Sequence, residues 1–106
     1  MDLADLRQLA LSFPETTEEP HHHFGSFRVR GKIFATFPPG DEYLHLFLSE
    51  AHREQALVLH PDFTEKLLWG GKVVGLRIQL QHADPAILAE LLHQAWHHKA
   101  PKALRK

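Results

Sequence analysis

Apolar residues recur with a helical period in three segments of the chain, residues 3–13, 50–59 and 85–99. Residues that favour the starts and ends of helices flank these segments: Asp2, Ser49 and Asp84-Pro85 precede them, and Pro14, His60-Pro61 and Pro101 follow them. Each segment therefore combines an apolar stripe with a cap and a stop. The pattern predicts three amphipathic helices, one near each end of the chain and one in the middle.

Alternation of apolar and polar residues predicts strands between the helices. Gly31 and Lys32 suit a two-residue hairpin turn, because glycine readily takes a positive φ. Residues 14–23 show no period, and we expect a loop there. The alternating runs are residues 27–30, 32–37, 43–48 and 73–80. In the last run we expect one shared face for Val74, Leu76, Ile78 and Leu80.

The order of these elements predicts an α+β fold, with a twisted antiparallel sheet backed by the N- and C-terminal helices. The 106 residues, 43% of them hydrophobic, can build one core, so we expect a single domain over residues 1–106. The chain has no cysteine, which excludes disulfides, thiol nucleophiles and thiolate zinc sites. With no apolar run of membrane-spanning length, we expect a cytoplasmic protein that does not enter a membrane.

Charge is distributed unevenly along a chain whose formal net charge is only −1. Residues 1–26 hold five carboxylates and one arginine, whereas residues 66–106 hold seven lysines and arginines and two carboxylates. Attraction to a polyanion therefore requires a local patch. The chain has ten histidines, and an unperturbed imidazole titrates near pH 6.5, so we expect binding to any anion to depend on pH.

Motifs for catalysis or metal binding are weak. The glycines of residues 70–75 are followed by a strand, not by the Ser or Thr and helix of a phosphate loop. His93 and His97 could share a helix face, but no carboxylate stands at metalloprotease spacing, and His21-His22-His23 point in different directions. No nucleophile, base and orienting residue can be assembled. We expect no enzymatic activity, no cofactor and no metal site.

Cations form the remaining constellation. They are Arg28, Arg30 and Lys32 in the first hairpin, Lys72 and Arg77 in the last strand unit, and Lys99, Lys102, Arg105 and Lys106 towards the C-terminus. Side by side, the two strand units would make a basic rim for phosphates, although polar strand residues that merely face water would show the same pattern. Tyr43, His45 and Phe47 form an aromatic strip that could stack on bases or pack under another element.

Three segments carry a resemblance to the MmcQ/YjbR-like family of small bacterial proteins. They are the stretch from Leu11-Ser12-Phe13-Pro14-Glu15 to His21, the Arg30-Gly31-Lys32-Ile33-Phe34-Ala35 hairpin with its flanks, and the closing Ala95-Trp96 with Ala100-Pro101-Lys102. The resemblance implies a frataxin-like (CyaY-like) fold and DNA binding through two hairpin wings. The first wing would hold Arg28, Arg30 and Lys32, and the second Lys72 and Arg77. Residues 67–71, Leu-Leu-Trp-Gly-Gly, depart from the more basic or aromatic segment of many relatives.

The leading hypothesis is a monomeric, non-enzymatic module that grips the phosphates of double-stranded DNA. Its candidate contacts are Arg28, Arg30, Lys32, Lys72, Arg77, Lys99 and Lys102. The alternative is a protein-interaction or small-ligand module that uses the aromatic sheet face, including Trp69. Iron handling, which frataxin relatives bring to mind, would rest on Asp2 and Asp5 in the first helix, a sparse set of oxygen ligands.

Overall fold

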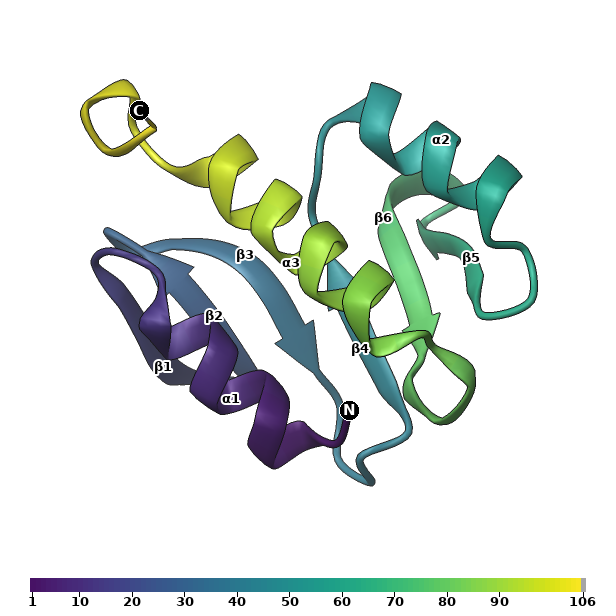
Figure 1. The fold of residues 1–106 in the computed structure, drawn as a ribbon, viewed down its shortest axis with the longest axis horizontal. Helices are drawn as coiled ribbons and strands as arrows, with labels where there is room; N and C mark the ends of the chain where they lie inside the picture. Colours follow the sequence, from purple (N-terminus) through teal and green to yellow (C-terminus); the bar gives the residue numbers. More distant parts are fainter. Residues whose placement is uncertain (106) are drawn as a thin grey trace.

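Three helices and six strands make up the part of the chain that the computed structural model describes, residues 1–105 (Figure 1). In chain order they are α1 (Leu3–Ser12), β1 (Thr16–His21), β2 (Phe24–Val29), β3 (Lys32–Phe37), β4 (Tyr43–Leu46), α2 (Glu50–Leu59), β5 (Thr64–Trp69), β6 (Lys72–Gln79) and α3 (Pro85–Lys99). Short 3-10 turns follow at Leu80–His82 and Lys102–Leu104. The predicted α+β class is confirmed.

The strands form one antiparallel sheet in the order β1-β2-β3-β4-β6-β5. The helices lie over one face of it, with α3 across β3 and β4 (Figure 1). Thr64, which pairs with the buried Ile78, donates a hydrogen bond to the His60 carbonyl at the end of α2, so α2 covers the same face. Arg7 of α1 likewise reaches Glu18, the partner of the buried Phe27. None of the helices in residues 1–105 covers the other face of the sheet.

The predicted caps fix the helix starts. Asp2 and Asp5 form a reciprocal capping box at α1, because each carboxylate accepts a bond from the other residue's backbone N–H. The Ser49 hydroxyl accepts from the backbone of His52 at α2. Asp84 caps α3, and Pro85 takes the first helical position, where a missing N–H costs nothing. All three helices therefore begin where the sequence predicts.

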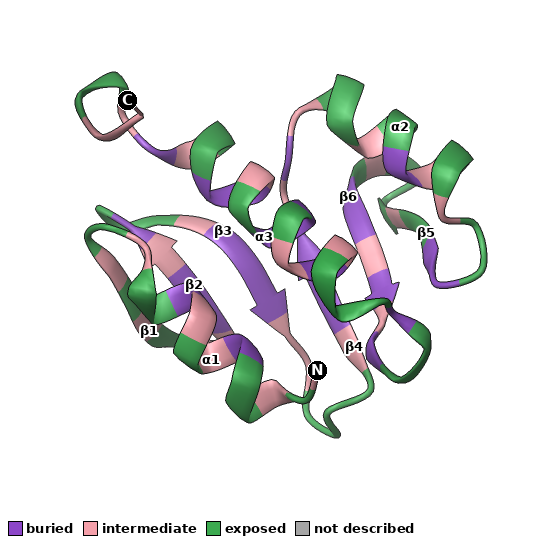
Figure 2. Cartoon of the chain, in the orientation of Figure 1, coloured by how far each residue is buried: buried purple, intermediate pink, exposed green. Residues whose placement is uncertain are grey.

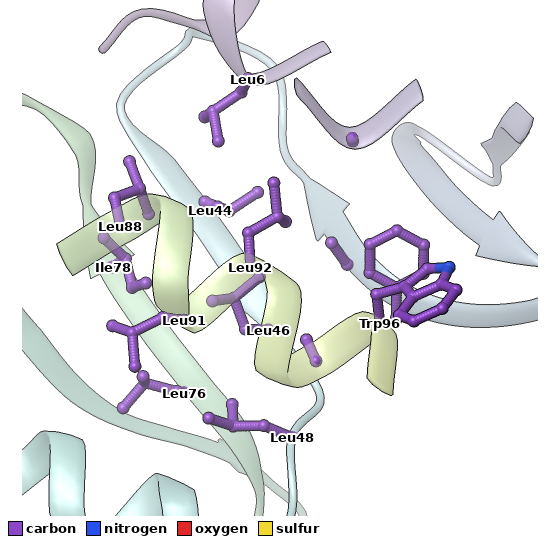
Figure 3. Close-up of a cluster of buried hydrophobic side chains, with 14 of the residues drawn as sticks. Leu6, Leu44, Leu46, Leu48, Leu76, Ile78, Leu88, Leu91, Leu92 and Trp96 are labelled. Atoms are coloured by element: carbon purple, nitrogen blue, oxygen red, sulfur yellow. The ribbon is translucent and has the colours of Figure 1, made fainter. Parts of the chain in front are cut away.

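The core lies between α3 and the inner face of the sheet (Figure 2). The apolar stripe of α3 meets alternate residues of β4 and β6, with Leu6 of α1 alongside (Figure 3). Truncation of such buried leucines to alanine typically costs about 2–5 kcal/mol. The labelled residues of this layer are Leu6, Leu44, Leu46, Leu48, Leu76, Ile78, Leu88, Leu91, Leu92 and Trp96.

Two edge strands depart from the prediction. Residues 14–23, predicted to be a loop, contain β1, whose sequence Thr-Thr-Glu-Glu-Pro-His is polar because an edge strand buries little side-chain surface. The pattern also gave no strand at β5, the opposite edge. Val74 is exposed instead of sharing the face of Leu76, because the ladder slips between Leu67 and Leu68. No helix in residues 1–105 is long and apolar enough to cross a membrane.

Candidate nucleic-acid interface

Two hairpin tips define the candidate site. The β2–β3 tip is Arg30-Gly31, with φ of 47° and 82°, and the β5–β6 tip is Gly70-Gly71, with φ of 58° and 81°. Paired positive φ angles are what a two-residue turn needs to match the twist of its strands. The first turn therefore lies one residue earlier than the predicted Gly31-Lys32, and Lys32 begins β3.

Strand directions bring both tips to the same end of the sheet. β3 and β6 each follow their tip in the chain, so each runs away from it. Both are antiparallel to β4, which lies between them, so they run in the same direction and their tips lie at the same end. β4 ends at Leu46, so the tip-side halves of β3 and β6 have no strand between them and form two wings. The end of α3 lies near the β2–β3 tip. Trp96 Nε1 donates to the Pro14 carbonyl at 3.2 Å, and Pro14 stands two residues before Thr16, the first residue of β1, which pairs with Val29 beside the tip.

The arginines predicted to contact DNA are already engaged within the protein. Arg30 forms a two-pronged ion pair with Glu15, with Nε–Oε1 at 3.0 Å and NH2–Oε2 at 2.9 Å. The hydrogen bond between them raises the pKa of Arg30 and lowers the pKa of Glu15. Arg28 donates to the Ser26 hydroxyl and to the Pro20 carbonyl. Neither guanidinium is the free cation that the sequence indicates.

Arg77 lies on the helix-free face of the sheet, in contact with Tyr43 and Glu65. Its guanidinium carbon lies 3.7 Å from the centre of the Tyr43 ring, and its Nε lies 3.4 Å from Glu65 Oε1. That Nε is buried and makes no hydrogen bond to the described residues. Arg77 therefore belongs to the framework of β4, β5 and β6, and the structure separates it from Lys72 at the wing tip.

The lysines remain available. No carboxylate of residues 1–105 lies within 4.0 Å of the ammonium groups of Lys32, Lys72, Lys99 or Lys102. Lys32 and Lys72 are exposed, and each is the first residue of its strand after the tip. Lys99, half-buried, is the last residue of α3, and the exposed Lys102 opens the following turn. We call these four residues the tip-end lysines.

Positive charge is concentrated further at the end of α3. Burial lowers the pKa of His98, and the charges of Lys99, Arg105, His52 and His97 lower it further. Basic side chains from α2, α3 and the C-terminal turn therefore lie in one neighbourhood. Lys106, the last residue of the predicted basic tail, lies outside the described residues.

The three side chains of the aromatic strip make contacts within the protein itself. His45 is buried on the helix-free face, beside the Thr36 hydroxyl and opposite Arg77, and its pKa is lowered by burial and then by that arginine. Tyr43 lies against Arg77, and Phe47 packs over Gly75. These side chains therefore serve the sheet and do not present a row of open ring faces.

Two shallow hollows open beside this strip. Their volumes are about 180 and 290 Å³, and both are lined by Gln79 together with acidic residues. Ligand pockets are usually larger, about 300–1,000 Å³, and mostly apolar. Both hollows are therefore smaller and more polar than a typical ligand pocket.

A family model described as YjbR matches residues 11–98, most of the chain. The chain belongs to the YjbR family. Among solved structures it is similar to the crystal structure of the Deinococcus radiodurans protein DR2400, a DUF419 domain. The identity is 20%, the TM-score is 0.77, and the match covers 98% of this chain and 85% of that one. No curated protein matches the chain.

The YjbR match covers both wings and most of α3, and the structural neighbour shares the fold over nearly the whole chain. Lys99 and Lys102 lie just beyond the matched residues, whereas Lys32 and Lys72 lie within them. Sequence reasoning missed Glu15 as the partner of Arg30. Its only sequence signal is its position in the acidic stretch of residues 15–19, and β1 returns that stretch to the first hairpin.

Proposed function

We propose that this YjbR-family protein is a non-enzymatic module that binds the phosphate backbone of double-stranded DNA with the tip-end lysines. The observation that carries the proposal is geometric. Both hairpin tips lie at the same end of the sheet and the end of α3 lies near the β2–β3 tip, and these three segments contribute lysines without a carboxylate partner within residues 1–105. Phosphate contacts need positive charge in position and little else.

The distribution of charge makes this end the favoured contact. The chain as a whole is close to neutral, with a net charge of −1, so it is not drawn to DNA from every side. Arg30 on the first wing is paired with Glu15, and Arg77 in the sheet is paired with Glu65, whereas Arg28 is hydrogen-bonded to neutral oxygens. Lysine is a compact cation without the forked geometry that reads guanine. We therefore expect binding that is weak, sensitive to salt and indifferent to base sequence.

The proposal predicts how strongly the affinity for DNA depends on salt concentration. Four neutralised phosphates release their counterions, so the logarithm of affinity should fall with the logarithm of salt at a slope of about −3.6. Fluorescence anisotropy with a labelled 20-base-pair duplex, at low salt and pH 6.5, measures this slope. Lys32→Ala with Lys72→Ala should make it shallower by about 1.8, one phosphate for each lysine.

A matched control is available on β5. Lys66 is exposed and lies in mid-strand, away from both tips, so Lys66→Ala removes the same charge without touching the candidate site. The proposal fails if the wild-type protein does not bind at tens of micromolar. It fails equally if Lys66→Ala weakens binding as much as a single tip-end substitution does.

The alternative, a small-ligand module on the aromatic face, has less support. His45 is buried, Tyr43 is occupied by Arg77, and the neighbouring hollows are small. A protein-interaction role has a different basis, since large apolar side chains are exposed elsewhere on the molecule.

A further inference from the structure

The two edges of the sheet are protected very differently. β1, at one edge, carries Glu18, Glu19 and Pro20, which are the residues that prevent another strand from pairing. β5, at the other edge, ends in Leu68 and Trp69, which are 58% and 81% exposed. An exposed strand edge with large apolar side chains favours pairing with a further strand.

Two separate apolar patches lie at opposite ends of β5. The first patch is the pair Leu68 and Trp69, which flank the edge of β5 on opposite faces of the sheet because they are consecutive in the strand, with Val74 on the neighbouring β6. The second patch is Val58 and Leu59, 78% and 61% exposed, at the end of α2. It lies by the start of β5, because the backbone N–H of Thr64 donates to the carbonyl of His60, the residue after Leu59.

We propose that two copies of this chain pair through β5, in antiparallel orientation, to form a twofold-symmetric dimer with one continuous sheet. In such a pair the end of one β5 lies beside the start of the other. Leu68 of each copy, on the face that α2 covers, then comes close to the second patch of the partner copy, so exposed apolar residues at both ends of β5 are brought together by one operation. An interface of this kind is complementary to itself, as twofold symmetry requires.

The charges on β5 restrict the register. A twofold axis at Lys66 would place two lysines directly opposite each other, which is unfavourable. An axis at Leu67 places Leu67 opposite its own copy and Trp69 opposite Glu65, and an axis at Leu68 places apolar residues opposite one another. With a net charge of −1 for each copy, long-range repulsion is small. The axis is therefore expected at Leu67 or Leu68, and the proposed dimer differs from the monomer expected from the sequence.

Sedimentation velocity tests self-association. A small interface is expected to have a dissociation constant in the micromolar range, so the protein should be measured from about 5 to 500 μM. The mass should rise with concentration from 12.2 kDa towards twice that value. Leu68→Glu with Trp69→Glu should abolish the rise and preserve the far-UV circular dichroism spectrum, since both side chains are exposed. Thr17→Glu, on the opposite edge, should leave it unchanged.

Disulfide mapping tests the geometry, because the chain has no cysteine of its own. Only residues near a twofold axis face their own copy, and paired Cα atoms in antiparallel strands lie about 4.5–5.5 Å apart, within disulfide range. Among single-cysteine variants at residues 65–69, oxidised dimer should be most abundant at Leu67 or Leu68, and at background level for Thr17→Cys. A protein that stays monomeric to 500 μM, or cross-linking no stronger in β5 than at Thr17, overturns the proposal. Neither result bears on DNA binding.

Discussion

Gly75 lies where β4 ends against β6, and we expect its replacement by alanine to disrupt this junction. A Cβ at Gly75 would lie 2.7 Å from the backbone oxygen of Leu46 and 3.1 Å from Phe47 Cδ1. The first distance is shorter than non-bonded atoms tolerate, and the oxygen belongs to backbone that is fixed by pairing between Leu46 and Leu76. One of the two strands must therefore move.

Overpacking of this kind typically costs about 1–3 kcal/mol. For a domain of this size, each kcal/mol lowers the melting temperature by about 4–8 °C, so Gly75→Ala should melt about 10 °C lower. Urea unfolding followed by circular dichroism should show a midpoint about 1 M lower, given slopes of about 1–3 kcal/mol/M.

Gly25→Ala provides a contrast in which the nominal overlap is worse. Its Cβ would lie 2.1 Å from Phe37 Cζ, but the obstacle is the end of a half-buried side chain that can turn towards solvent. We therefore expect Gly25→Ala to cost less than Gly75→Ala despite the shorter distance. If Gly25→Ala is the more damaging of the two, or if Gly75→Ala unfolds within about 0.5 kcal/mol of wild type, the reasoning from backbone rigidity is wrong.

Three further predictions follow from single contacts. Glu15→Gln frees Arg30 for one more phosphate, so the salt slope of DNA binding should steepen by about 0.9 in anisotropy titrations. Because the pKa of His45 is lowered in the folded state, the unfolded state binds a proton first as the pH falls. The free energy of unfolding measured in urea should therefore decrease as the pH drops below about 6.5 and through that lowered pKa, and it should decrease less steeply in His45→Gln. Trp96→Phe keeps the ring packing but loses the bond to the Pro14 carbonyl, which should cost about 1 kcal/mol in thermal unfolding.

The helices and central strands could be predicted because burial imposes a period on them. The stripe of α3 is set by one buried face, the alternation of β4 puts Leu44 and Leu46 on the core face, and the caps at Asp2, Ser49 and Asp84 are local hydrogen bonds. The edge strands β1 and β5 lack a continuous buried face, so their sequences carry no comparable period. Their existence depends on pairing with β2 and β6, which is a non-local property.

The residue types of the candidate site could be predicted from the sequence, but the intramolecular contacts that engage its arginines could not. Sequence spacing correctly places Arg28 on the face opposite Phe27 and Val29, whereas Arg30 lies in the turn. It gives no indication that Glu15, fifteen residues before Arg30, returns beside the tip through β1 and neutralises it. The Arg77 contact with Tyr43 depends in the same way on strand order, since β4 and β6 are neighbours in the sheet although α2 and β5 separate them in the sequence.

The short length of β4 connects the fold with the proposed binding surface. β4 ends after four residues because the chain turns away towards the cap of α2 at Ser49. β3 and β6 continue past that point towards their tips, so Lys32 and Lys72 lie on backbone that contributes little to the core. Substitution of these lysines should therefore alter affinity for DNA without altering the free energy of unfolding, whereas Gly75→Ala should alter the free energy of unfolding first. A loss of binding in lysine variants that unfold like the wild type would consequently identify the tips themselves as the contact surface.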